Sequence, residues 1–383
     1  MRITKFFKSF FSSSQSSGIL LVLCVMISLM LANSSAAAGF QEILDKPIGP
    51  YSVSVWINDG LMAIFFLLVG LEIKRELLQG ELSSFKNASL PIFAAIGGML
   101  VPALIFYLFN NGTEFSKGWA IPMATDIAFS LAIVAMLGKS VPAAVKVFLA
   151  ALAIVDDLGA IVVIAIFYTD TIYWDYLIYS AIIVGVLIAL NYFKVKQHIF
   201  YLIPGALLWY LMHHSGIHAT IAGVLLAFTI PTATDKDELS PLEKLEHALH
   251  LPVSYIITPI FALANTNITF KEGMVDGLFS NLGYGIMFGL ILGKLIGVNL
   301  FSFIAIKLKI SSLPDKSNWV HMAGVGLLAG IGFTMSIFIT LLSYKGDVAL
   351  QDSAKFAILV ASVLAGVLGY LLLKSVAKND RSI

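Results

Sequence analysis

Long apolar stretches separated by short polar or turn-rich segments repeat along the whole chain. A helix that crosses a membrane needs about 20 mostly apolar residues, and stretches of this kind predict twelve spans. Their expected bounds are 18–38, 57–77, 88–110, 119–138, 143–168, 175–193, 199–213, 216–231, 248–265, 283–306, 320–343 and 354–375. The pattern therefore predicts an all-α polytopic membrane protein. We expect one integral membrane domain over 1–383, with a short N-terminal arm (1–17) and a C-terminal tail (376–383).

Basic residues alternate between the two sides of the predicted spans. Cytoplasmic loops are enriched in Lys and Arg; with the N-terminus inside, 18 of the 24 Lys and Arg residues lie on the cytoplasmic side and five on the other. Both termini are therefore expected in the cytoplasm. A cleaved signal peptide, ending near SSAAAG, is the alternative for the first stretch. It would leave eleven spans, which the loop charges contradict. Lys294 is the one basic residue that no loop accounts for.

The composition excludes several other classes of protein. The chain is 58% hydrophobic and 12% charged, whereas about a quarter of the residues of soluble domains are charged. A net charge of +1 without a long basic run argues against nucleic-acid binding. The single cysteine, Cys24, excludes an intramolecular disulfide. We expect no cofactor.

Two adjacent carboxylates, Asp156 and Asp157, lie in the apolar run AALAIVDDLGAIVVIAIFYT. A charge at the centre of a bilayer costs about 2.5 to 3.5 kcal/mol and usually marks an ion or proton pathway. Two carboxylates about 4 Å apart repel each other by about 4 kcal/mol at a dielectric constant of 20, which favours retention of a proton. Small, hard cations prefer oxygen ligands. A cation that binds both carboxylates must displace that proton, as an exchanger requires.

Two middle spans are predicted to be broken. The fourth contains Pro122, which removes a helix hydrogen bond, followed by Thr125, and the eleventh contains four glycines within 324–332. Asp126 follows Thr125 and can either bind a cation or neutralise helix N-termini. Lys294 can pair with Asp156 or Asp157, bind helix C-terminal ends, carry a proton, or be structural.

The topology suggests a repeat. The third to fifth spans begin from the cytoplasm and the tenth to twelfth from the opposite side, so the two triplets are predicted to be inverted repeats, a common transporter architecture. Sequence identity between them is weak. The prediction depends on what they share, which is intramembrane charge and an interrupted middle span.

Acidic and histidine residues cluster at the predicted cytoplasmic ends of two spans. Glu72 and Glu76 are four residues apart on one helix face, and SPLEKLEHALH supplies Glu246, His247 and His250. Histidine titrates near physiological pH, so these groups can sense pH. A solvated charged face is the other interpretation. His218 lies near the opposite surface, where a structural role is the alternative.

Five segments of the chain together resemble the NhaA family of bacterial sodium/proton antiporters. In their order along the chain they are VGLEIKRELL, ATDIAFSLAI, ALAIVDDLGAIVVIAIFYT, SGIHATIAG and GLILGKLIGV. The resemblance covers essentially the whole chain. It implies a secondary active transporter, not an enzyme. Such a transporter sits in the cytoplasmic (inner) membrane, expels Na⁺ or Li⁺ in exchange for protons, is electrogenic and is activated at alkaline pH. Two carboxylates suggest two protons per sodium.

The resemblance also assigns roles to the intramembrane residues. Asp156 and Asp157 become the proton and cation carboxylates, with Asp157 favoured as the direct sodium ligand. Thr125 and Asp126 lie beside them where the broken helices cross, and Lys294 pairs with Asp156 when no sodium is bound.

Further implications concern pH response and assembly. Glu72, Glu76, Glu246, His247 and His250 match a cytoplasmic region linked to pH response, and His218 matches a histidine that modulates it. Glu243 departs from the family, which often has a basic residue there. The family forms homodimers through a small β-hairpin between the first two spans, and the alternating stretch 51–57 is compatible with one of its strands.

Two other classes remain as alternatives. An intramembrane aspartyl protease uses two aspartates that share a proton, which Asp126 and Asp157 can imitate, but it leaves the doubled aspartate and Lys294 unexplained. A cation channel would conduct without moving protons.

Overall fold

The computed structural model describes residues 14–169, 171–232 and 239–379. Within them the chain is almost entirely helical, as the apolar pattern predicts, with one two-stranded hairpin. Most of the predicted N-terminal arm, residues 1–13, lies outside the described residues, and so do residues 380–383 of the predicted tail. The described parts of both segments belong to helices, α2 (Ser14–Ala32) and α19 (Val348–Asn379).

Seven described helices or continuous helical runs are long and apolar enough to cross a membrane, and each overlaps a predicted span. The span predicted at 143–168, for example, is α8 (Ala143–Phe167). The prediction of an all-α polytopic membrane protein is confirmed. The seven runs are Val53–Leu78, Phe85–Asn110, Ala143–Phe167, Trp174–Tyr192, Pro241–Asn265, Asn281–Lys307 and Val348–Val376.

The described helices yield at most ten spans, if each of three bent helix pairs counts as one. Predicted spans 199–213 and 216–231 correspond to α10 (Ile199–Ser215) and α11 (Ile221–Thr229), of 17 and nine residues. Both are shorter than the roughly 20 residues that a crossing needs. The count of twelve therefore stays a prediction.

The predicted C-terminal end of the first span, at residue 38, is wrong. Helix α2 ends at Ala32, and the chain bends by 111° into α3 (Ala37–Asp45). The Asn33 side chain donates to the Leu29 carbonyl at 2.8 Å, which satisfies one of the last carbonyls of the helix. Hydropathy alone did not detect this end because the following SSAAAG segment is also free of charge.

The chain divides into two compact units, a division that the expectation of one domain did not include. Unit 1 is Met1–Asn33, Glu81–Ala160 and Asn265–Ile383, and unit 2 is Ser34–Gly80 and Ile161–Ala264. Because each unit is assembled from separate stretches of sequence, no linker or change of composition marks it.

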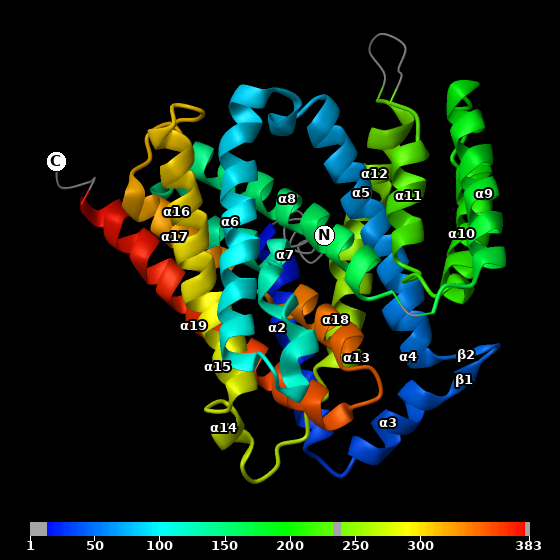
Figure 1. The fold of residues 1–383 in the computed structure, drawn as a ribbon, viewed down its shortest axis with the longest axis horizontal. Coiled ribbons are helices and arrows are strands. Elements are labelled where there is room, and N and C mark those ends of the chain that lie inside the picture. The colour runs from blue at the N-terminus through cyan, green and yellow to red at the C-terminus, as the bar shows by residue number, and fades with distance from the viewer. Residues whose placement is uncertain (1–13, 170, 233–238, 380–383) are drawn as a thin grey trace, which may run out of the picture. The chain divides into compact units, whose positions relative to one another are not determined.

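Unit 1 is organised around α6 (Phe85–Asn110) and α16 (Lys294–Lys307), which pack along each other (Figure 1). Gly97 and Gly297 face each other, and a Cβ on either would lie only 2.2 or 2.1 Å from the carbonyl oxygen of the other. Only glycine permits this approach of two backbones. Unit 1 also contains α2, α19 and the part of α8 up to Ala160. Its other helical elements are η2 (Glu81–Ser83), η3 (Glu114–Gly118), η4 (Ile121–Met123), α7 (Ile127–Met136), η5 (Gly138–Ser140), α14 (Met274–Gly277), α15 (Asn281–Phe288), η7 (Gly289–Gly293), α17 (Trp319–Ala329) and α18 (Phe333–Ser343).

Unit 2 packs α5 (Met62–Leu78) against α11 and α9 (Trp174–Tyr192) against α10. Leu71, Leu187 and Leu208 are fully buried in the resulting core. Burial of these apolar side chains holds the short α11 in place, because a nine-residue helix is not stable alone. Unit 2 also contains α12 (Pro241–Pro252), η6 (Val253–Ile257) and nearly all of α13 (Thr258–Asn265).

A small hairpin precedes α5, as the family resemblance implies. Strand β1 (Pro47–Ile48) pairs antiparallel with β2 (Tyr51–Ser52), and Gly49 adopts a φ of +64° in the turn. The expected strand over 51–57 was too long, because the Ser52 side chain accepts a hydrogen bond from the Val55 N–H and begins a helix. The chain continues through α4 (Val53–Val55) and the π-helical η1 (Trp56–Leu61) into α5.

Candidate functional site

Two helix breaks lie against each other in unit 1. The first separates η4 from α7 and the second separates α17 from α18; the bends are 43° and 44°. Both occur where Pro122 and the glycine-rich run predict them. The Asp126 N–H donates to the Ile331 carbonyl at 2.6 Å, and the Thr125 hydroxyl lies 2.8 Å from the Ala329 carbonyl oxygen. Backbone groups that lack a helix partner at one break are thus hydrogen-bonded by residues at the other break.

Asp126 caps two helices at once. Its Oδ1 accepts from the Phe129 N–H at 3.0 Å, in the first turn of α7. Its Oδ2 accepts from the Thr334 N–H at 3.1 Å and the Thr334 hydroxyl at 2.5 Å, in the first turn of α18. Helix N-termini carry partial positive charge, so one buried carboxylate neutralises both. Of the two roles that the sequence left open for Asp126, this geometry favours the neutralisation of helix N-termini.

Asp156 pairs with Lys294. The lysine Nζ lies 2.5 Å from Asp156 Oδ2, and both side chains are completely buried. The Thr125 hydroxyl lies 2.7 Å from the same oxygen. Asp156 Oδ1 is buried without a hydrogen-bond partner among the described residues. Of the roles considered for Lys294, the geometry therefore supports that of counter-ion, to Asp156.

Asp157 is the next residue of α8 and is 2% exposed. Successive helix positions are about 100° apart, so the two carboxylates leave the helix in different directions from one short segment. The structure thus brings Thr125, Asp126, Asp156 and Lys294 into one contact network in unit 1, with Asp157 adjacent to it along α8.

The predicted pH-response residues lie in unit 2 and form two separate groups. In the first group, Arg75 joins Glu76 to Glu246: its Nη1 lies 2.9 Å from Glu76 Oε1 and its Nε lies 3.0 Å from Glu246 Oε2. Glu72 precedes Glu76 by one turn of α5. His247 and His250 are exposed on α12, the helix that carries Glu246. Arg75 was not among the predicted site residues.

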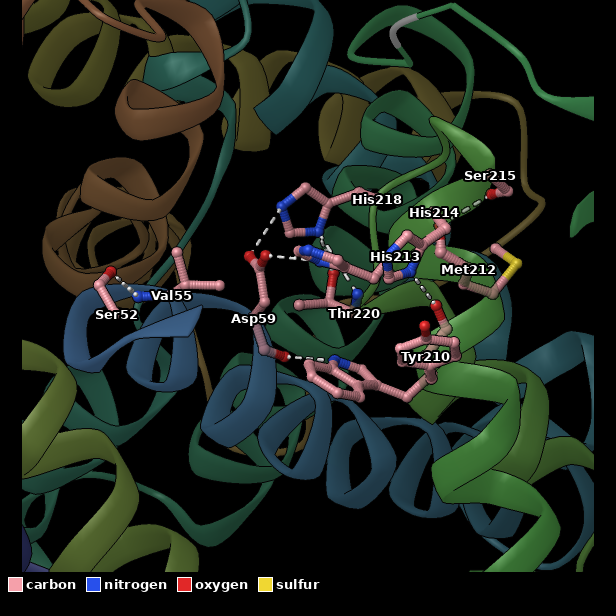
Figure 2. A network of polar contacts seen from close by, with 11 residues as sticks. Ser52, Val55, Asp59, Tyr210, Met212, His213, His214, Ser215, His218 and Thr220 are labelled. Carbon is pink, nitrogen blue, oxygen red and sulfur yellow. Dashed lines mark hydrogen bonds and ion pairs between the residues drawn. The ribbon is translucent and has the colours of Figure 1, made fainter. Parts of the chain in front are cut away.

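The second group surrounds His218. Figure 2 shows the Asp59 carboxylate facing the rings of both His213 and His218, with one oxygen toward each. The His213 Nδ1 lies 3.1 Å from Asp59 Oδ2, and the His218 Nε2 lies 3.7 Å from Asp59 Oδ1. The His218 Nδ1 lies 2.7 Å from the Thr220 hydroxyl oxygen. His218 therefore belongs to a histidine–carboxylate cluster.

Tyr51 of the hairpin packs against this cluster. Its ring contacts His213 edge to face, with centroids 4.7 Å apart. Burial, with smaller contributions from Tyr210 and Asp59, raises the pKa of the Tyr51 hydroxyl above its ordinary value. The phenol is consequently neutral at physiological pH and contributes packing and a dipole, not a charge.

Sequence reasoning missed several of these groups. Asp59 is a single carboxylate in the stretch WINDGLM, a weaker form of the signal that identified Asp156. Thr334 and Ser336 occur in GFTMS, directly after the glycines of the second break, and Ser130 closes TDIAFS. Hydroxyl residues close to a helix break were the available signal, because freed backbone groups in a membrane need donors and acceptors nearby.

Buried carboxylates, a buried lysine and two facing helix breaks within an all-helical polytopic protein are typical of membrane transporters for cations. The sequence matches the family model described as Na⁺/H⁺ antiporter 1 over residues 8–373. The chain belongs to this family, so the resemblance drawn from its motifs is confirmed.

Curated relatives are similar over nearly the whole chain. The Na⁺/H⁺ antiporter NhaA 2 of Flavobacterium johnsoniae is 56% identical over 98% of this chain and 94% of its own length. The Na⁺/H⁺ antiporter NhaA of Dechloromonas aromatica is 52% identical over 99% of this chain and 98% of its own length. The Na⁺/H⁺ antiporter NhaA of Flavobacterium psychrophilum is 51% identical, with the same two coverages.

Proposed function

We propose that this protein expels Na⁺ or Li⁺ from the bacterial cytoplasm in exchange for protons, as a secondary active transporter activated at alkaline pH. Family membership supports the class of substrate. The observation that carries the proposal is the buried contact of Lys294 with Asp156, directly before a second buried carboxylate. An ammonium, a proton and a sodium ion all compete for the same oxygens, and this competition couples their movements.

Sodium is the substrate of this site and requires oxygen ligands. Asp156 Oδ1, which accepts no hydrogen bond from the described residues, is one such oxygen, and the Asp157 carboxylate and Thr125 hydroxyl supply others. A cation at these oxygens weakens the hold of Lys294 on Asp156 and excludes protons from both carboxylates. When sodium leaves, protons return.

The stoichiometry follows from the charge of the two carboxylates. If release of sodium lets Asp157 take up one proton and the Asp156–Lys294 pair take up another, two protons cross for each sodium ion. One net positive charge then moves per cycle, and exchange is electrogenic. A reversal potential that corresponds to one proton per sodium would reject this part of the proposal.

The proposal includes the arrangement of the spans in the membrane and the assembly of the protein. Inverted repeats over spans 3–5 and 10–12 are supported by the reciprocal approach of Gly97 and Gly297 and by the two facing breaks. Twelve spans with both termini in the cytoplasm are proposed from the apolar pattern and the loop charges alone. The hairpin Pro47–Ser52 supports a homodimer of the kind that the family forms. The Arg75 and His218 groups are proposed to adjust activity to pH.

The protease alternative has little support from the geometry. It needs Asp126 to share a proton with a second aspartate, whereas both Asp126 oxygens accept hydrogen bonds from helix N-termini. No observation favours a channel over exchange.

Proton movement in inside-out vesicles tests the proposal. Vesicles with an acidic interior should lose part of the proton gradient when Na⁺ or Li⁺ is added, and K⁺ should have no effect. The response should grow between about pH 7 and pH 9. Vesicles from cells without the protein are the control, and absence of a Na⁺ response over this range would refute the proposed exchange.

A further inference from the structure

Two serines at equivalent positions join the broken helices. Ser130 is the fourth residue of α7, and Ser336 is the fourth residue of α18. The Ser130 hydroxyl lies 2.8 Å from the carbonyl oxygen of Leu328, near the end of α17. The Ser336 hydroxyl lies 2.7 Å from the carbonyl oxygen of Ile121, in η4. Helix α7, which follows the first break, therefore bonds α17, which precedes the second break. In the same way, α18 follows the second break and bonds η4, which precedes the first.

The Ser130 hydroxyl has a second acceptor within reach, the Asp126 carbonyl at 2.8 Å. A hydroxyl donates only one hydrogen bond at a time. The Asp126 carbonyl also receives the N–H of Ser130 at 3.0 Å, so it does not depend on the hydroxyl. The Ser130 hydroxyl therefore links the two broken spans through its contact with the Leu328 carbonyl.

These contacts are shielded from solvent. Both serines are 0% exposed, so no water from bulk solvent takes the place of a lost hydroxyl. Without the Ser130 hydroxyl the Leu328 carbonyl keeps the Ile331 N–H, at 3.1 Å, but loses its bond to the other broken span. The rings of Phe129 and Phe333 meet edge to face beside them, with centroids 5.3 Å apart. Hydrogen bonds and packing together define one arrangement of the two breaks.

The same arrangement positions the ion site. Between the two serine contacts lie those of Thr125 with Ala329 and of Asp126 with Ile331 and Thr334. Thr125 in turn contacts Asp156. Neither serine forms a hydrogen bond with Asp156 or Lys294 in the described structure. A shift of either break would nevertheless move Thr125 relative to the Asp156 carboxylate, and displacements of about 1 Å are enough to impair a site.

We propose that Ser130 and Ser336 are a matched pair of positioning residues for the transported cation. By holding the carbonyl ends at Leu328 and Ile121, they keep the two breaks in register, and that register sets the affinity for Na⁺. The inference rests on the proposed exchange function and adds two residues to it. Because both serines fix the same crossing, their effects on affinity are coupled.

Transport kinetics of three variants and one control test this role. Ser130→Ala and Ser336→Ala should each raise the KM for Na⁺ about fivefold, the factor that corresponds to about 1 kcal/mol for one hydrogen bond. The maximal rate should change less. The double variant should raise the KM by less than the product of the two factors. The control is Ser343→Ala, since the Ser343 hydroxyl bonds the Ile339 carbonyl of its own helix at 2.8 Å, and its KM should equal that of the wild type.

Each outcome decides the proposal. An unchanged KM in both single variants, or an equal rise in Ser343→Ala, overturns the positioning role while leaving the exchange function intact. A wild type without any Na⁺ response overturns the exchange function, and the inference with it. If an alanine variant is not recovered as folded protein, the cysteine variant of the same position keeps a weak donor. It should then show a smaller KM rise in the same direction, and an unchanged KM counts against the proposal.

Discussion

The charged groups of unit 1 and unit 2 are held in opposite ways. In unit 1, Asp126, Asp156 and Lys294 are at most 2% exposed. Asp126 bonds helix ends and the Thr334 hydroxyl, and Asp156 bonds the Thr125 hydroxyl and Lys294. In unit 2, the side chains of Arg75 and Asp59 are 35% and 21% exposed, and each carries two charged or titratable partners.

This contrast separates two kinds of electrostatic function. A buried charge is tolerated only with its partner in place, so a change at the unit 1 site is expected to act as all or none. Half-exposed groups exchange partners with water, and their interactions are weak and graded. This difference agrees with the proposal that transport chemistry uses the first environment and that adjustment to pH uses the second.

The largest expected effect is the loss of exchange in Asp157→Asn. The amide keeps the shape of the side chain but removes the charge and the titratable group that we propose bind sodium and a proton. Na⁺-dependent proton movement in vesicles should fall to background while the protein remains folded in the membrane. The matched control is Asp175→Asn at an exposed position of α9, which should keep wild-type rates. Full activity of Asp157→Asn would remove this residue from the site.

A second prediction concerns stability. Lys294→Gln leaves the Asp156 carboxylate buried without its ammonium partner, and removal of one member of a buried ion pair typically costs about 3–5 kcal/mol. The unfolding temperature in detergent should fall clearly. The double variant Lys294→Gln with Asp156→Asn should recover much of the loss, because neither charge remains. A single variant as stable as the wild type would show that the pair is not held as the structure describes.

Glu246→Gln is expected to have an intermediate effect. It removes the carboxylate that Arg75 contacts at 3.0 Å, but Arg75 keeps Glu76 and water as partners. The free energy of unfolding should fall by about 1–3 kcal/mol, because Glu246 is buried and accepts charge-assisted hydrogen bonds from Arg75. The pH of half-maximal exchange should shift, with the maximal rate retained. An unchanged pH profile would exclude this group from pH response, and exchange measured from pH 6 to 9 decides it.

The smallest effect is expected for His213→Gln. Its contact with Asp59 joins two partly exposed side chains, and such contacts contribute little to stability. The variant should lose less than about 1 kcal/mol of stability. The unfolding temperature in detergent measures this loss. A fall as large as that of Lys294→Gln would contradict the distinction between the two environments.

Much of the helical architecture could be predicted from hydropathy because a bilayer imposes a length on apolar helices. The bounds of α8 were predicted almost to the residue, and the breaks near Pro122 and the run of glycines were located. The end of α2 at Ala32 and the brevity of β2 were missed, since both depend on single side-chain bonds from Asn33 and Ser52. Hydropathy does not record such bonds.

The candidate site was predictable in part for the same reason. Asp156, Asp157 and Lys294 stood out because charge is rare in apolar stretches. Which carboxylate Lys294 contacts, and whether Asp126 binds an ion or caps helices, were left open. These questions concern distances between spans that are far apart in the chain, and no local pattern encodes them.

The sequence by itself indicated a membrane protein, placed Asp156, Asp157 and Lys294 within apolar spans, and located the interruptions of two spans. The cause is local: each property follows from the cost of placing a charge, a proline or several glycines within an apolar helix. Only the tertiary structure decided that the two breaks bond each other, that Asp126 caps both following helices, and that Lys294 selects Asp156. Those outcomes depend on how hydroxyl, carboxylate and carbonyl groups from separate spans satisfy one another where water is excluded.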